Sequence, residues 1–161
     1  KITALHYKKT IQEIHRLFAP VQFYMEYSFG GLAVSLALEE TDHTSNYRLV
    51  LIAPATETST AIDTFFSFLD LDPALRPEFE KIILQKGGVS PAWYSISRAM
   101  KHIRARVLWF HDEEDDVTPL SDALKVKAEN YPHMEFVFTK GLGHRRIYRD
   151  NQVAKAIVDF L

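Results

Sequence analysis

Four short apolar runs in this chain have the length and composition of buried β-strands. They span residues 21–25, 49–53, 107–110 and 134–138, and segments with helical spacing separate them. Continuous apolar runs of this length are typical of parallel strands, which are covered on both faces. Strands that alternate with helices connect through right-handed crossovers. The pattern therefore predicts the α/β fold class, with about four parallel strands flanked by helices.

The first predicted helix precedes the first run and ends at Pro20. Its apolar face is formed by residues that recur at helical spacing, namely Tyr7, Ile11, Ile14 and Phe18. His6 and His15 lie on this amphipathic helix and are expected to face solvent.

Further helices are predicted after the strands. Residues 32–38 are apolar nearly all round, which implies burial on more than one side. Ser121 can cap a helix that carries Leu124 and Ala128. The last helix is expected from about Asp150.

One long stretch, about residues 57–103, contains no strand pattern. Three helical segments follow one another there: one that carries Ile62, Phe65, Phe66 and Leu69, one over 73–85, and one over 90–102. A long helical insertion between consecutive parallel strands, at their carboxyl ends, is where lids and caps are placed. The stretch is therefore predicted to be a helical cap within a single domain, 1–161.

Composition and charge narrow the range of functions. A length of 161 residues is that of about one domain. The formal net charge of -2 and the lack of a basic stripe argue against a nucleic-acid or anionic-membrane partner. No run approaches the roughly 20 apolar residues of a membrane span. The absence of cysteine excludes a thiolate nucleophile and fits a cytoplasmic protein, which we expect.

A serine stands where the first strand turns into the apolar helix. Ser28 is preceded by Tyr27 and followed by Phe29, Gly30 and Gly31. A strand that passes through a sharp turn into a helix, with serine at the apex, presents the hydroxyl clear of the sheet. The helix behind it leaves N–H groups free for a developing oxyanion. Ser28 is therefore a candidate nucleophile, although a serine on a turn is more often a turn residue or a helix cap.

An acidic loop follows the third strand and contains five consecutive carboxylates, from Asp112 to Asp116. A carboxylate just past a sheet strand lies where it can orient a histidine. Asp115 is the candidate, with Asp112 and Asp116 as rivals. A solvated acidic loop, or one that binds a cation, is the alternative interpretation.

A histidine follows the fourth strand, in the loop that contains Gly141 and Gly143. The glycines allow the loop to adopt unusual dihedral angles and to approach a neighbour closely, so His144 is the candidate base. No pair among the seven histidines has the H-E-x-x-H spacing, so no metal site is predicted.

The order of these three residues is more informative than any one of them. Serine, acid and histidine follow separate strands in the chain order of α/β-hydrolases. With the Ser28 turn, the acid loop that ends at Pro119 and the glycine loop before His144, the chain resembles the C-terminal two-thirds of an α/β-hydrolase. The resemblance covers essentially every residue and aligns the family's acid with Asp115. Some members place the acid one strand earlier, which would nominate Glu57.

The resemblance implies a partial α/β-hydrolase fold and a serine hydrolase of carboxylesterase type. Ser28 would attack an ester, or less often an amide, His144 would transfer the proton, and Asp115 would orient the imidazole. The backbone N–H of Phe29 would be one oxyanion donor, and no cofactor is implied. The expected substrate is a small apolar ester, contacted by aromatic residues of the insertion, namely Phe65, Phe66, Trp93 and Tyr94.

Two features depart from the family pattern. Glu26 stands two residues before the serine, where the family has glycine or another small residue. About four strands precede the nucleophile strand in the family, whereas only 27 residues precede Ser28 here. The chain is therefore expected to be a truncated piece with weak or no activity, and its apolar strand 21–26 to be an exposed edge. We expect that edge to pair with the missing N-terminal half or with a second copy in a homo-oligomer.

Two other functions remain open at the level of the sequence. One is a non-catalytic module of the same fold that binds a ligand or a partner. The other is a different reaction on this fold: dehalogenases carry aspartate at the turn, so Ser28 excludes that branch by resemblance, while perhydrolase activity stays open.

Overall fold

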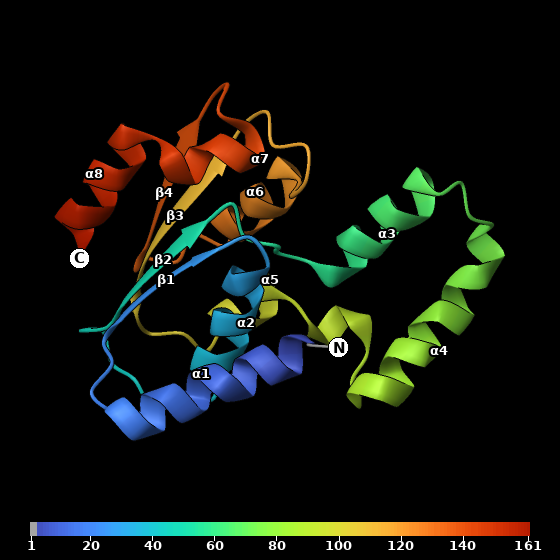
Figure 1. The fold of residues 1–161 in the computed structure, drawn as a ribbon, viewed down its shortest axis with the longest axis horizontal. Coiled ribbons are helices and arrows are strands. Elements are labelled where there is room, and N and C mark those ends of the chain that lie inside the picture. Colours follow the sequence, from blue (N-terminus) through green and yellow to red (C-terminus); the bar gives the residue numbers. More distant parts are fainter. Residues whose placement is uncertain (1–2) are drawn as a thin grey trace.

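The computed structural model describes residues 3–161, and its centre is a four-stranded parallel sheet. The strands are β1 (Phe23–Tyr27), β2 (Arg48–Ile52), β3 (Arg106–Asp112) and β4 (Met134–Thr139). The strands lie side by side in chain order, and each connection leads from one strand to the next strand in the same sheet (Figure 1). The predicted α/β class and the parallel sheet are confirmed.

Helices cover both faces of the sheet. One face carries α1 (Ala4–Phe18), α2 (Phe29–Leu38), α5 (Ile96–Met100) and α6 (Leu120–Ala128). The other face carries the 3₁₀ turn η3 (Ile147–Arg149) and α8 (Asn151–Phe160). The short helix α7 (Gly143–Arg146) lies in the chain between β4 and η3.

The alternation of side chains along the strands produces two cores. On β2 and β3, Leu49, Leu51, Val107 and Trp109 belong to the larger core, under α2, α5 and α6. Their neighbours Val50, Ile52, Leu108 and Phe110 belong to the smaller core, under α8. Both sets are buried, which explains why these strands are continuous apolar runs rather than alternating ones.

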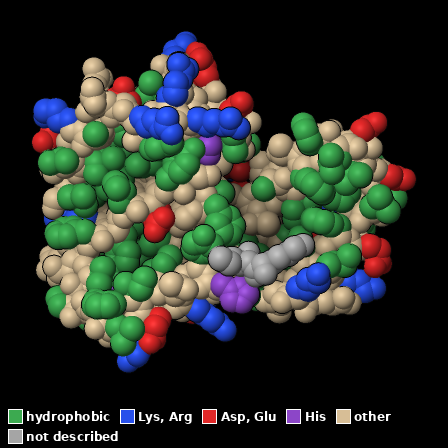
Figure 2. Space-filling view, viewed as in Figure 1, with side chains coloured by type: hydrophobic (Ala, Val, Ile, Leu, Met, Phe, Trp, Pro, Cys, Tyr) green, Lys and Arg blue, Asp and Glu red, His purple; other side chains and the backbone are tan. Residues whose placement is uncertain are grey.

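The insertion between β2 and β3 forms an arm on the body of the molecule. It contains α3 (Thr58–Phe68), η1 (Pro73–Leu75), α4 (Arg76–Gly87) and η2 (Pro91–Trp93), before α5. Figure 1 shows α3 and α4 extending away from the sheet, and Figure 2 shows a hollow between this arm and the body. The ring of Phe79 lies 5.8 Å from that of Phe65 and 5.6 Å from that of Phe66, and joins α4 to α3.

The buried face of α1 differs from the predicted one. Lys8 is its buried residue, 8% exposed, whereas Phe18 is 69% exposed. Lys8 pairs with Glu40 at 2.5 Å and lies over the ring of Trp93, so its aliphatic stem is covered while its charge is matched. The expectation that His15 faces solvent is also wrong, because its ring is half-buried and Nδ1 lies 2.7 Å from the Tyr24 hydroxyl.

Three element boundaries also differ from expectation. β1 ends at Tyr27, two residues later than predicted, so that Glu26 lies inside the strand. α6 begins at Leu120 with Pro119 as its N-cap residue, so Ser121 lies inside the helix and does not cap it. The expected single helix over 90–102 is divided into η2 and α5, because Ser95 is extended and caps α5 by accepting from the N–H of Arg98.

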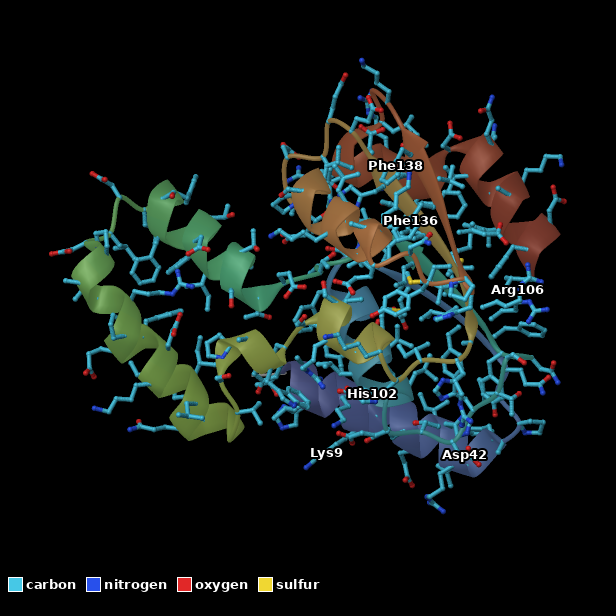
Figure 3. All side chains as sticks on the ribbon, turned by 180° about the vertical axis from the view of Figure 1, so that it is seen from behind. Lys9, Asp42, His102, Arg106, Phe136 and Phe138 are labelled. Carbon is cyan, nitrogen blue, oxygen red and sulfur yellow. The ribbon has the colours of Figure 1, made fainter. Side chains whose placement is uncertain are left out.

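The two edges of the sheet have different surroundings. At the β4 edge, seen from behind in Figure 3, Phe136 and Phe138 stack with centroids 6.1 Å apart, and Lys127 lies over the Phe138 ring. At the β1 edge, Phe23 and Met25 are 55% and 56% exposed. Within residues 3–161, no helix is long and apolar enough to cross a membrane.

The two glycines in the first turn of α2 provide a matched test of packing. A Cβ on Gly31 would lie 2.6 Å from Cβ of Pro54, whose ring cannot rotate away. A Cβ on Gly30 would clash only with the flexible carboxylate end of Glu26. Gly31→Ala is therefore expected to lower the free energy of unfolding by about 1–3 kcal/mol, measured by urea denaturation.

Gly30→Ala is the control for that measurement. Its clash is relieved by rotation of the Glu26 side chain, and alanine is favoured over glycine within a helix by about 1 kcal/mol, so the net change is expected to be smaller. Equal losses in the two variants would contradict the assignment of Pro54 as the rigid contact.

Candidate active site

The turn between β1 and α2 holds Ser28 in a conformation that non-glycine residues rarely adopt. Its φ is 54° and its ψ is -122°. The neighbouring loop supports this turn, because Ser28 N–H donates to the carbonyl of Ile52 at 3.0 Å and the Ser28 carbonyl accepts from the N–H of Ala55, also at 3.0 Å. Strain kept in place by such bonds is typical of functional turns.

Glu26 is accommodated beside this turn. Its carboxylate occupies the space next to Gly30, where a side chain at position 30 would otherwise lie. Burial raises the pKa of Glu26. A large side chain at position 26 therefore faces a glycine at position 30.

Ser28, His144 and Asp115 form one hydrogen-bonded chain. His144 Nε2 lies 3.0 Å from Ser28 Oγ, and His144 Nδ1 lies 2.8 Å from Asp115 Oδ2. When Nδ1–H donates to the carboxylate, Nε2 is left as the acceptor for the serine hydroxyl. The side chains of His144 and Asp115 are 6% and 0% exposed. The three residues come from the loops after β1, β3 and β4.

The carboxylate of Asp115 accepts four hydrogen bonds. Oδ1 accepts from the N–H groups of Val117 and Thr118 at 2.8 Å each, and Oδ2 accepts from the Thr118 hydroxyl at 2.9 Å as well as from His144. Burial alone would raise the pKa of Asp115, but these bonds outweigh it and lower the pKa. The group therefore stays ionised beside the imidazole.

Thr118 was not singled out in the sequence, yet its Oγ1 also lies 3.3 Å from His144 Nδ1. Its position three residues after Asp115 is the available signal, since an aspartate often accepts from the backbone two or three residues on.

The other candidate acids, Asp112, Asp116 and Glu57, make no hydrogen bond to the His144 side chain in the described structure. Asp112 is buried and accepts from the Thr139 hydroxyl at 2.7 Å and the Leu142 N–H at 3.0 Å, which ties the acid loop to the histidine loop. Asp116 is exposed. Glu57 accepts from the hydroxyls of Ser95 and Ser97 at the base of the arm. Of the four, the structure places only Asp115 against His144.

A second histidine lies beneath the acid. His111 is fully buried; its Nε2 lies 2.9 Å from the Thr118 carbonyl and 3.8 Å from Asp115 Oδ2. Burial lowers the pKa of His111, so the ring is neutral and donates Nε2–H to that carbonyl. It thereby supports the backbone that holds the carboxylate.

An apolar cavity of about 300 Å³ lies beside the turn, between the body and the arm. Phe29 and Leu32 of α2 form one wall of the cavity, and Ile82 and Ile83 of α4 form another. Tyr94 completes the lining between them. Phe29, which directly follows Ser28 in the chain, connects the serine turn to this cavity, whose lining does not include Ser28 or His144.

The four aromatic residues expected to contact substrate lie in two pairs, Phe65 with Phe66 and Trp93 with Tyr94, rather than around one cavity. Tyr94 lines the cavity, whereas Phe65 and Phe66 pack with Phe79 in the arm. Trp93 lies between Lys8 and Arg98, 5.1 Å and 4.5 Å from its ring centre. Nothing in the sequence marked Ile82 and Ile83 as cavity-lining residues, because they lie within a helix and belong to no motif.

For residues 3–161, no group of three or more histidine or carboxylate side chains is placed to hold a metal ion.

Comparisons with solved structures agree on the architecture. A monoacylglycerol lipase from Paleococcus ferrophilus superposes with a TM-score of 0.66 and 22% identity over 98% of this chain and 74% of its own. The α/β hydrolase GrgF from Penicillium sp. sh18 gives 0.62 and 15% over 99% of this chain and 71% of its own. The chain has an α/β-hydrolase fold. No protein-family model and no curated protein sequence matches it.

The α/β-hydrolase fold accounts for the position of the three residues, because its loops at the carboxyl ends of parallel strands meet along one edge.

The chain also matches a puromycin-hydrolysing peptidase of Mycobacterium tuberculosis, with a TM-score of 0.62 and 14% identity over 92% of this chain. It spans 23% of that peptidase chain.

The buried titratable groups predict how stability depends on pH. Burial lowers the pKa values of His111 and His133, so the unfolded chain binds more protons than the folded one below about pH 6.5. The free energy of unfolding should therefore decrease as pH falls below that value. Hydrogen bonds lower the pKa of Asp115, which adds a second decrease below about pH 4.

Urea denaturation at intervals from pH 8 to pH 3 checks this prediction. In the variant His133→Leu the decrease between pH 6.5 and pH 5 should be smaller, and the loss of a buried nitrogen without a hydrogen-bond partner should not destabilise the fold at pH 8. An unchanged decrease in that variant would refute the assignment to His133.

Proposed function

We propose that this chain carries the active site of a serine hydrolase that cleaves carboxylic esters through an acyl-enzyme intermediate. The observation that supports it is the chain of hydrogen bonds from Ser28 Oγ through the imidazole of His144 to the buried Asp115 carboxylate. A serine hydroxyl is a weak nucleophile by itself, and a base within hydrogen-bonding distance, oriented by a third group, is what activates it.

Each group has its own role in the proposed reaction. Ser28 Oγ attacks the carbonyl carbon while its proton passes to His144 Nε2. His144 then protonates the leaving alkoxide as the carbon–oxygen bond breaks, which leaves an acyl-serine. A water molecule, deprotonated by His144, hydrolyses that ester and releases the carboxylic acid. Asp115 keeps its negative charge and stabilises the imidazolium that forms in each half of the reaction.

One oxyanion donor is available within the described chain. Phe29 is the first residue of α2, so its N–H is among those that the helix leaves without an internal partner. The N-terminus of α2 also carries a partial positive charge, which favours the negative oxygen of the tetrahedral intermediate.

The cavity supports an ester with an apolar chain as the substrate. Its volume of about 300 Å³ is at the lower end of the range for small-molecule pockets, which suits a chain of several carbon atoms. Its walls are mainly aliphatic and aromatic, so a hydrocarbon chain of medium length would be desolvated on entry.

Labelling with a fluorophosphonate tests the nucleophile. We expect modification at Ser28 in the unaltered chain, none in Ser28→Ala, and labelling slowed about 100-fold or more in Asp115→Asn, because the imidazole loses its partner. Labelled peptides are identified by mass spectrometry.

Asp116→Asn is the matched control, since Asp116 is exposed and should leave the labelling rate unchanged. A chain that remains unmodified at Ser28, or one in which both aspartate variants behave alike, would favour a non-catalytic module of the same fold.

A series of p-nitrophenyl esters of rising acyl length tests the cavity. Ile83→Trp narrows it, so kcat/KM for octanoate should fall about 10-fold or more relative to acetate, because several methylene groups lose their contacts. Leu84→Trp alters the next residue, which lies outside the cavity lining, and should leave the ratio unchanged. The same ratio in both variants would place the acyl chain elsewhere.

A further inference from the structure

Tyr27 contacts the histidine in two ways. It is the last residue of β1 and directly precedes Ser28. Its hydroxyl donates to the backbone carbonyl of His144 at 3.0 Å. Its ring lies 4.9 Å from the imidazole, centre to centre, at an interplanar angle of 38°. One side chain therefore holds both the backbone and the ring of His144, and it comes from the strand that also leads into the serine.

The loop that carries His144 needs support from outside. α7 has only four residues, too few for a helix to be stable by itself. Gly141 and Gly143, with φ values of 80° and 58°, precede the histidine and contribute no side chains to packing. The contacts with Asp115 and Ser28 hold the imidazole at its two nitrogens, but they leave its faces and its backbone free.

A second aromatic ring, that of Tyr148, also packs against Tyr27. The two ring centres lie 4.8 Å apart, so Tyr27 contacts both Tyr148 and the imidazole. A side chain that a neighbouring ring already holds loses little further freedom when it also supports the imidazole. Burial raises the pKa of Tyr27, and the nearby Tyr148 and Asp115 add to the effect, so the hydroxyl keeps the proton that it donates.

We propose that Tyr27 is a positioning residue for His144: it fixes the height and tilt of the imidazole so that Nε2 stays within reach of the serine through both halves of the reaction. The inference rests on the proposed function and adds a residue to it. It differs from the roles of Asp115 and Thr118, which act at Nδ1, because Tyr27 acts at the ring face and the backbone.

Besides positioning the imidazole, the contact between the rings of Tyr27 and His144 has an electrostatic effect during the proposed reaction. His144 becomes an imidazolium whenever it holds the serine or water proton. The face of an aromatic ring attracts a cation within about 6 Å of its centre. The Tyr27 ring therefore interacts more strongly with the charged histidine than with the neutral one, which favours the transition state over the ground state.

The chain offers a matched control on the same strand. Tyr24 of β1 also hydrogen-bonds through its hydroxyl to a histidine, His15 of α1, at 2.7 Å, and this pair lies away from the site. Tyr24→Phe and Tyr27→Phe thus remove the same atom, and each removes one hydrogen bond to a histidine, at the ring of His15 and at the backbone of His144. A purely structural role for Tyr27 would make the two variants alike in activity.

Steady-state kinetics with a p-nitrophenyl ester form the first measurement. Tyr27→Phe keeps the ring and should lower kcat about 3- to 10-fold with KM unchanged, the size expected for one hydrogen bond. Tyr27→Leu removes the ring as well and should lower kcat about 100-fold. Tyr24→Phe should leave kcat unchanged. A change confined to KM, or an equal kcat in Tyr27→Phe and Tyr24→Phe, would overturn the proposal.

Amide hydrogen exchange of the peptide that covers 141–149 is the second measurement, and it does not require activity. Tyr27→Phe should increase exchange in that peptide, and Tyr24→Phe should not. If the unaltered chain turns over no ester and Ser28 stays unlabelled, the proposed function fails whatever exchange shows. If the unaltered chain is active and either kcat or exchange in Tyr27→Phe matches the unaltered chain, the positioning role fails alone.

Discussion

The backbone of Ser28 is the constraint on which the rest of the site depends. A residue with a side chain pays a steric cost at a φ of 54°, and the cost is met only where neighbouring groups hold the peptide from both sides. Here the support comes from β2 and the loop after it, through Ile52 and Ala55. Gly31 lets α2 approach Pro54 closely enough for these bonds to form. The serine is therefore presented by the sheet and the helix together.

The parallel sheet brings Ser28 close to side chains from other loops. Because all four strands run in one direction, the loops that follow β1, β3 and β4 emerge at the same edge. Ser28 and His144 are 116 residues apart in the chain, and Ser28 Oγ lies 3.0 Å from His144 Nε2. Asp112 joins the acid loop to the histidine loop, and His111 supports the acid loop from below. Buried polar groups of this kind fix a geometry because each has few alternative partners.

Several features of the fold could be predicted because they depend on local pattern. The apolar runs identified all four strands, and the turn residues identified the loops that carry the candidate side chains. The face of α1 was mispredicted because a lysine can be buried when its stem packs against Trp93 and its charge meets Glu40, and periodicity counts it as polar. The arm aromatics were misleading for a related reason: a phenylalanine that packs against another helix has the same sequence pattern as one that faces a cavity.

The sequence by itself determined the α/β class, the strand order along the chain, and the succession of serine, acid and histidine after separate strands, since each of these depends on residues close together in the chain. Only the tertiary structure decided which of the consecutive carboxylates meets the imidazole. Asp115 is the one whose oxygens are turned inward by the N–H groups of Val117 and Thr118, and that orientation is set by the folded loop. The tertiary structure also decided where Glu26 lies, what lines the cavity and that Tyr27 contacts His144, because each of these depends on distances between segments that the chain order leaves undefined.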